Sequence, residues 1–187
     1  SGATVGLTYT LGSDDHGNTL LKQFASQYGN DGYAVNLMFD NGPLLLIANY
    51  ELKADSNRSF VWNAGGTYRI GDLKLFLGYE QSTFKSLGDF YAVRGNQKEW
   101  LTGLQYRIGP NLLIASYNRG KLDNSPHDGH ANKYALGYGY DLSKRTQLYA
   151  NVVYVDSSNE YVGSVYNSNG AANDSMTGVQ FGITHKF

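Results

Sequence analysis

Long stretches of strict two-residue alternation constrain the fold of this chain more than any other feature of its sequence. From Tyr134 to Leu142, apolar or aromatic residues occupy every second position, and small or charged residues such as Asp141 lie between them. Side chains of a β-strand point alternately to its two faces, so such a stretch predicts a strand with one apolar and one wetted face. Ten stretches of this kind cover most of the chain, at 3–11, 32–40, 43–53, 59–70, 73–84, 98–109, 111–122, 131–142, 146–157 and 176–187.

The length of these stretches favours strands that cross a membrane. A tilted transmembrane strand needs about 9–11 residues, whereas strands of soluble domains average about 5–6 residues. No run of about eighteen apolar residues occurs, which argues against transmembrane helices. A soluble β-sandwich with tyrosines on its inner face is the alternative fold, but its strands should be shorter. We therefore expect an all-β protein whose strands build a transmembrane, antiparallel, up-and-down β-barrel.

The connections between the stretches alternate between short and long. Short turns are expected at Asn41-Gly42, Gly71-Asp72, Gly109-Pro110 and Ser143-Lys144. Longer linkers rich in Asp, Asn, Ser and Gly are expected at 12–31, 54–58, 85–97, 123–130 and 158–175. Short periplasmic turns and long extracellular loops are typical of barrels in the bacterial outer membrane. This asymmetry predicts a C-terminus on the periplasmic side.

Composition agrees with an aromatic-belted wall and excludes several other classes. The chain has 23 glycines and 16 tyrosines but no cysteine, so neither a disulfide framework nor a thiolate metal site is expected. A net charge of −1 gives no sign of nucleic-acid binding. Aromatic residues near both ends of the strands predict two interfacial girdles. One girdle would hold Tyr68, Tyr106, Tyr140 and Phe187, and the other Tyr50, Tyr79, Tyr117 and Tyr154.

Two segments resemble the general porins of β-proteobacteria. The segment 138–149, YGYDLSKRTQLY, resembles a hairpin of these porins, and the final residues 177–187, TGVQFGITHKF, resemble their C-terminus. Residues 2–9 are similar to a mid-barrel strand of the same family. The resemblance implies a sixteen-stranded barrel that assembles as a homotrimer and is embedded in outer-membrane lipid and lipopolysaccharide. It also implies passive diffusion of small hydrophilic solutes and ions, with no cofactor.

The extent of the chain leaves two interpretations open. The ten strands would be the last ten of a sixteen-stranded porin, or they would close as a small barrel with a structural or adhesive role. The chain starts at Ser1 with no signal peptide, so it is either a mature protein or a piece of a longer one. Residues 1–187 are accordingly one barrel domain or its C-terminal portion. An open sheet would leave two unpaired edges in lipid, so the strands must close on themselves or pair with other polypeptide.

Charged residues on the wetted face are the candidate lining of a pore. Rings of charge tune ion selectivity in such channels, although the same residues could simply hydrate the wall or pair inside a plugged barrel. Arg69, Arg107 and Lys186 are expected near the periplasmic mouth, and Glu51 and Glu80 higher in the wall. The full set of candidates is Glu51, Lys53, Arg69, Lys74, Glu80, Arg107, Lys133 and Lys186.

An enzymatic alternative rests on the loop cluster Asp14-Asp15-His16. Barrel proteases of the omptin type use acidic pairs with an Asp–His pair, but these three residues are contiguous and nothing indicates that they converge on a substrate. Loop acids such as Asp123 could bind a cation, although their spacing matches no EF-hand. We therefore expect neither an enzyme nor a metal site.

The last stretch ends in an aromatic residue. Outward positions alternate through Phe181 to Phe187, and a terminal aromatic of this kind resembles the signal read by the barrel-assembly machinery. The alternative is that Phe187 only anchors the girdle.

Overall fold

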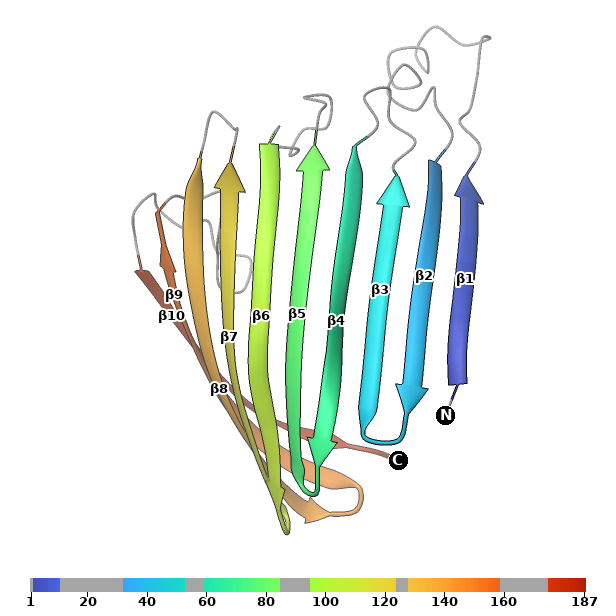
Figure 1. Ribbon diagram of the computed structural model, residues 1–187. Coiled ribbons are helices and arrows are strands. Elements are labelled where there is room, and N and C mark those ends of the chain that lie inside the picture. The colour runs from blue at the N-terminus through green and yellow to red at the C-terminus, as the bar shows by residue number, and fades with distance from the viewer. Residues whose placement is uncertain (1, 11–31, 53–58, 85–94, 124–127, 159–174) are drawn as a thin grey trace, which may run out of the picture.

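The computed structural model describes residues 2–10, 32–52, 59–84, 95–123, 128–158 and 175–187. These residues form one sheet of ten antiparallel strands in which each strand pairs with its neighbours in sequence (Figure 1). Within the described residues there is no helix of the length and apolar character that a membrane span needs. The strands are β1 (Gly2–Thr10), β2 (Gly32–Asn41), β3 (Leu44–Leu52), β4 (Phe60–Ile70), β5 (Leu73–Phe84), β6 (Gly95–Ile108), β7 (Asn111–Asp123), β8 (Gly129–Ser143), β9 (Thr146–Ser157) and β10 (Ser175–His185).

The strands follow the alternating stretches closely, so the predicted fold class is confirmed. The expected loops at 85–97 and 123–130 are partly wrong, because β6 begins at Gly95, β7 ends at Asp123 and β8 begins at Gly129. The strands extend further there through paired polar residues, such as Asn96 opposite Asp123. Alternation of apolar residues could not predict these extensions, because the added residues are polar or glycine. β10 ends two residues earlier than expected, and Phe187 lies beyond it.

The four short turns occupy 42–43, 71–72, 109–110 and 144–145. The first lies one residue later than the expected Asn41-Gly42, because Asn41 still pairs with Leu44 as the last residue of β2. Gly42, Gly71 and Gly109 have φ angles of 62°, 58° and 56°, in the left-handed region that favours glycine. Pro43 and Pro110 follow two of them, and proline holds φ near −65°. A positive and then a negative φ is the pattern of a type II′ turn, which suits two-residue hairpins.

The fourth turn needs no glycine because a serine side chain supports it. The Ser143 hydroxyl accepts hydrogen bonds from the backbone N–H groups of Arg145 and Thr146, at 3.2 and 3.1 Å. The turn therefore lies at 144–145 rather than at the expected Ser143-Lys144. The β8–β9 pairing also shifts register between Asp141 and Ser143.

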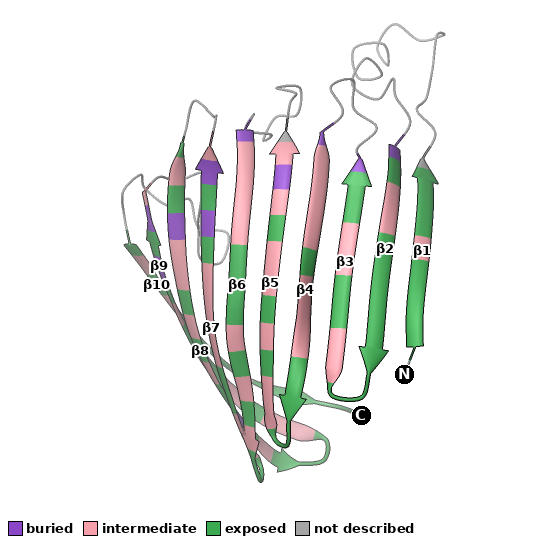
Figure 2. Ribbon diagram, in the orientation of Figure 1, coloured by how far each residue is buried: buried purple, intermediate pink, exposed green. Residues whose placement is uncertain are grey.

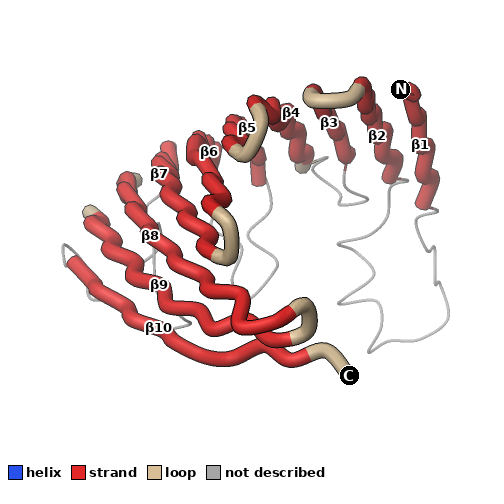
Figure 3. Tube along the Cα trace, turned by 90° about the horizontal axis from the view of Figure 1, so that it is seen from below, coloured by secondary structure: helices blue, strands red, loops and turns tan. Residues whose placement is uncertain are grey.

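Viewed along the strands, the sheet curves into an open arc whose edges are β1 and β10 (Figure 3). Among the described residues, β1 pairs only with β2 and β10 only with β9. The ten strands thus do not close on themselves, which contradicts the small closed barrel. If the sheet lies in lipid, its two edges need other polypeptide to pair with them, because unpaired edges are not tolerated there.

Candidate functional site

The two faces of the sheet differ in chemistry, and the strand register assigns residues to each. Directly paired residues share a face, so Leu104, Ala115 and Leu136 form a row that continues to Val152 and Val179. Leu136 is 60% exposed and Val179 is 65% exposed. Exposed positions extend along most strands (Figure 2). Soluble monomers rarely expose so extensive an apolar surface, so this outer face suits lipid.

Aromatic side chains border the outer face on its loop side. The Tyr79 ring lies 4.3 Å from the Trp100 ring and the Tyr117 ring 5.0 Å from the Tyr134 ring, measured between centroids. The Tyr117 hydroxyl donates a hydrogen bond of 2.9 Å to Asn132, so it keeps a polar partner. We call this row the loop-side belt. Its ring contacts join Tyr33, Tyr50 and Phe60, then Trp62, Tyr79 and Trp100, then Tyr117, Tyr134 and Tyr154.

The opposite, inner face carries a row of polar residues across five strands. Asn36, Asn49, Asn63, Glu80 and Glu99 are directly paired from β2 to β6, and we call this row the polar ladder. The Asn49 amide donates to Asn63 at 2.6 Å, and the Asn63 amide donates to Glu80 at 3.4 Å. Glu80 and Glu99 are like charges on directly opposed positions, which is unfavourable. Water on the inner face is what would screen them.

A second set of charged residues lies at the turn-side end of the wall. The backbone N–H groups of Arg69, Arg107, Asp141 and Lys186 donate to the carbonyls of the last turn residues of the preceding hairpins, Pro43, Asp72, Pro110 and Arg145, at 2.9, 3.1, 2.9 and 2.9 Å. These four residues therefore hold equivalent positions in successive hairpins. We call them the turn-side ring. The expected mouth residues Arg69, Arg107 and Lys186 all belong to it.

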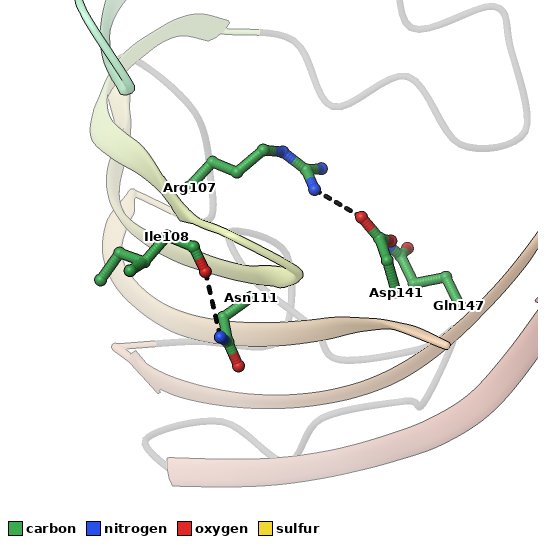
Figure 4. Close-up of polar contacts among 5 residues, drawn as sticks. All are labelled: Arg107, Ile108, Asn111, Asp141 and Gln147. Carbon is green, nitrogen blue, oxygen red and sulfur yellow. Dashed lines mark hydrogen bonds and ion pairs between the residues drawn. The ribbon is translucent and has the colours of Figure 1, made fainter. Parts of the chain in front are cut away.

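Two members of the turn-side ring form an ion pair across an intervening strand. The Arg107 guanidinium on β6 donates to the Asp141 carboxylate on β8 at 2.5 Å, and Gln147 donates to the same carboxylate at 2.7 Å (Figure 4). The side chains of Arg107 and Asp141 are 42% and 34% exposed. Both groups are thus partly solvated, and the ion pair and the Gln147 hydrogen bond hold the Asp141 carboxylate in place. Sequence reasoning missed Asp141, although it lies inside the YGYDLSKRT segment.

The other predicted pore-lining residues are placed as follows. Lys74 is directly opposite Arg69 on the inner face, and Lys133 is opposite Asn118. Glu51 is opposite Val61 on that face as well. Lys53 lies outside the described residues, and Lys186 lies past the end of β10. A role in conduction stays a prediction for all of them.

Two further expectations concern acidic clusters. Asp14, Asp15 and His16 lie outside the described residues. Asp123 is not a loop residue: it ends β7, and its carboxylate lies 2.8 Å from the Lys121 ammonium and 4.0 Å from that of Lys98. Among the described residues no three or more His, Cys, Asp or Glu side chains gather where they could hold a metal ion.

The two segments that carry the family resemblance contact each other directly. The Thr146 hydroxyl lies 2.9 Å from Nδ1 of His185, and the Lys186 N–H donates to the Arg145 carbonyl at 2.9 Å. The Phe187 ring meets the His185 ring edge-on at 4.9 Å and is otherwise fully exposed. Phe181 points outward from β10 and is 79% exposed. The hairpin thus holds the strand that ends in the expected assembly signal.

An antiparallel wall with an aromatic-bordered apolar outer face and rows of polar and charged residues on its inner face defines part of an outer-membrane β-barrel. Comparison with known proteins agrees. A family model described as Gram-negative porin matches residues 1–160. The chain therefore belongs to the Gram-negative porin family, which resides in the bacterial outer membrane.

Individual relatives point the same way. The chain is 27% identical to outer membrane porin protein 32 of Delftia acidovorans, over 94% of this chain and 59% of the relative. It is 26% identical to an outer membrane porin protein of Bordetella pertussis, over 80% of this chain and 48% of the relative. The chain thus spans about half to three-fifths of the length of these relatives.

A solved structure supports the fold alone. It is a loop L8 deletion mutant of OmpT, an outer membrane protein of Vibrio cholerae, and it matches with a TM-score of 0.68 at 20% identity. The match covers 99% of this chain and 65% of that protein.

Proposed function

We propose that this chain forms part of the wall of a porin, a passive and non-enzymatic channel for small hydrophilic solutes and ions. The polar ladder is the observation that carries the proposal. It places Glu80 and Glu99 side by side on the face opposite the apolar one, where water must screen them. A dry or fully plugged interior would instead require each carboxylate to be paired.

The open sheet and the lengths of the relatives support a larger barrel than these ten strands could make. Ten of sixteen strands would be about five-eighths of a barrel wall, close to the 59% of the Delftia relative that the match covers. The missing strands would pair with the free edges of β1 and β10. On this proposal the barrel around the channel is complete only in the full-length porin. The full-length porin would assemble as a homotrimer.

The turns and the C-terminus supply a proposed orientation. The two-residue turns would face the periplasm and the longer connections the exterior, with the C-terminus periplasmic. Phe181, in the outward row of β10, and Phe187, at the turn-side end of the chain, would then be the aromatic residues presented to the barrel-assembly machinery. Labelling of single cysteines on intact cells should reach position 128, between β7 and β8, and should spare position 110.

Conductance of the full-length protein in planar bilayers tests the channel directly. We expect stable open steps, and an absence of steps would overturn the proposal. Replacing both ladder acids, Glu80→Gln with Glu99→Gln, should shift the reversal potential in a salt gradient toward anion preference, because two negative charges leave the inner face. Asp123→Asn removes one carboxylate from the outer face and is the control that should leave the potential unchanged. An equal shift in the control would contradict the assignment of faces.

A further inference from the structure

Three cations lie on the outer face, where a lipid-facing wall is expected to be apolar. The register pairs Trp100 with Arg119 and Lys98 with Lys121, so all three cations share the face of the Trp100 ring. Arg119 is exposed, and the side chains of Lys98 and Lys121 are 42% and 57% exposed. We call Lys98, Arg119 and Lys121 the basic patch.

Within the part of the chain that the structure describes, ion pairs engage this patch only in part. Asp123 forms ion pairs with two of its members, at 2.8 Å from the Lys121 ammonium and 4.0 Å from the Lys98 ammonium. No described residue forms an ion pair with Arg119. Asp156 shares the face but is separated from Arg119 by Asn132 on the intervening strand. Among the described residues, two of the three cations thus form ion pairs with a single carboxylate, and Arg119 takes part in none of them.

The height of the patch in the wall indicates what its counter-charge is. Lys98 is two residues from Trp100 toward the loop side, which is about 7 Å along a strand. Interfacial tryptophans and tyrosines lie at the level of the lipid head groups. The patch is therefore at or just beyond that level, where lipid phosphates are found and where long basic side chains extend toward polar surroundings.

The surface beneath the patch suits hydrocarbon chains. Rings of the loop-side belt lie directly below it, with Tyr79 against Trp100 and Tyr117 against Tyr134. Below them come exposed aliphatic side chains such as Leu136. Phosphate-binding cations above and an apolar wall below match the two ends of one amphipathic lipid.

We propose that the basic patch binds the phosphate groups of lipopolysaccharide in the outer leaflet, while the acyl chains lie along the apolar wall beneath. This inference rests on the proposed orientation, which puts the loop side at the outer leaflet. Arg119 supplies a planar donor fork for a phosphate, and the two lysines supply point charges beside it. Asp123 competes with the ligand for both lysines.

The test is a titration of phosphorylated lipopolysaccharide into the full-length, delipidated protein in detergent, with EDTA present to exclude bridging divalent cations. The variant carrying K98Q, R119Q and K121Q should lose at least about tenfold in affinity. The variant carrying R69Q, K74Q and K133Q loses the same charge from the inner face and should bind like the unaltered protein. Asp123→Asn should bind more tightly, because both lysines are released.

Further arms identify the ligand group and separate this site from the channel. Lipopolysaccharide from which the phosphates have been removed should bind the unaltered protein as weakly as phosphorylated lipopolysaccharide binds the outer-face variant. Conductance of the outer-face variant in lipopolysaccharide-free bilayers should be unchanged, which also shows that the variant folds. Undiminished binding by that variant, or equal binding of the dephosphorylated lipid, would overturn the proposal even if the channel conducts.

Discussion

Neighbouring residues on β9 offer a sharp test of the two faces, because the same substitution should have opposite consequences at each. Val152 points outward between Leu136 and Val179, in the middle row of the apolar face. Asn151 points inward, opposite Gly137 and Gln180. We expect Val152→Arg to destabilise the folded protein and Asn151→Arg to leave its stability nearly unchanged.

The magnitude follows from the depth of Val152. An arginine on the lipid face costs about 2–4 kcal/mol at the bilayer midplane and about 0–1 kcal/mol near the interfaces. Tyr154 of the loop-side belt is two residues away, about 7 Å along the strand, so the guanidinium can extend part of the way toward the interface. We therefore expect a cost of about 2 kcal/mol, which is about 30-fold in the folding equilibrium.

The assay is reversible unfolding of the full-length protein by guanidinium in lipid vesicles, followed by tryptophan fluorescence. The difference between the two variants is the quantity of interest, since both add one positive charge to the same strand. Equal destabilisation by both substitutions would refute the assignment of faces. A larger loss for Asn151→Arg would reverse it.

Two further predictions address the turn-side end of the wall. Asp141→Asn should lower stability by about 0.5–1 kcal/mol, since its partner Arg107 is 42% exposed. It should also shift the reversal potential toward anions, because Arg107 loses its counter-charge; an unchanged potential would place the pair away from the ion path. Gly42→Ala should cost about 1 kcal/mol in unfolding free energy, because its φ is 62° and an L-residue is strained there. Gly78→Ala is the control, since its nearest neighbour lies at 3.9 Å and its φ is ordinary, and an equal loss there would remove backbone strain as the cause.

Much of the wall could be predicted from local sequence alone. Alternation sets which residues share a face, because successive strand residues point in opposite directions. It correctly grouped Arg69, Lys74 and Lys133 on one face. Glycine located the turns that begin at Gly71 and Gly109 for an equally local reason, the positive φ angle that this residue readily adopts. The ends of β6 and β8 were less predictable, since polar residues there pair without an apolar signal.

Which residues of different strands lie side by side was decided by the tertiary structure. Register decides that Glu80 opposes Glu99 and that Asp123 lies between two lysines, and register is a property of paired strands rather than of one strand. The Arg107–Asp141 pair spans an intervening strand, so it depends on how three strands are placed beside one another.

The same division holds for the C-terminal strand. Its sequence alone indicated an outward row ending in Phe187, because alternation is a property of the sequence of one strand. Only the folded sheet shows that Thr146 contacts His185, and that β10 is an unpaired edge. Whether a strand is an edge depends on which other strands are present to pair with its backbone N–H and C=O groups. The sequence of the strand itself does not determine this.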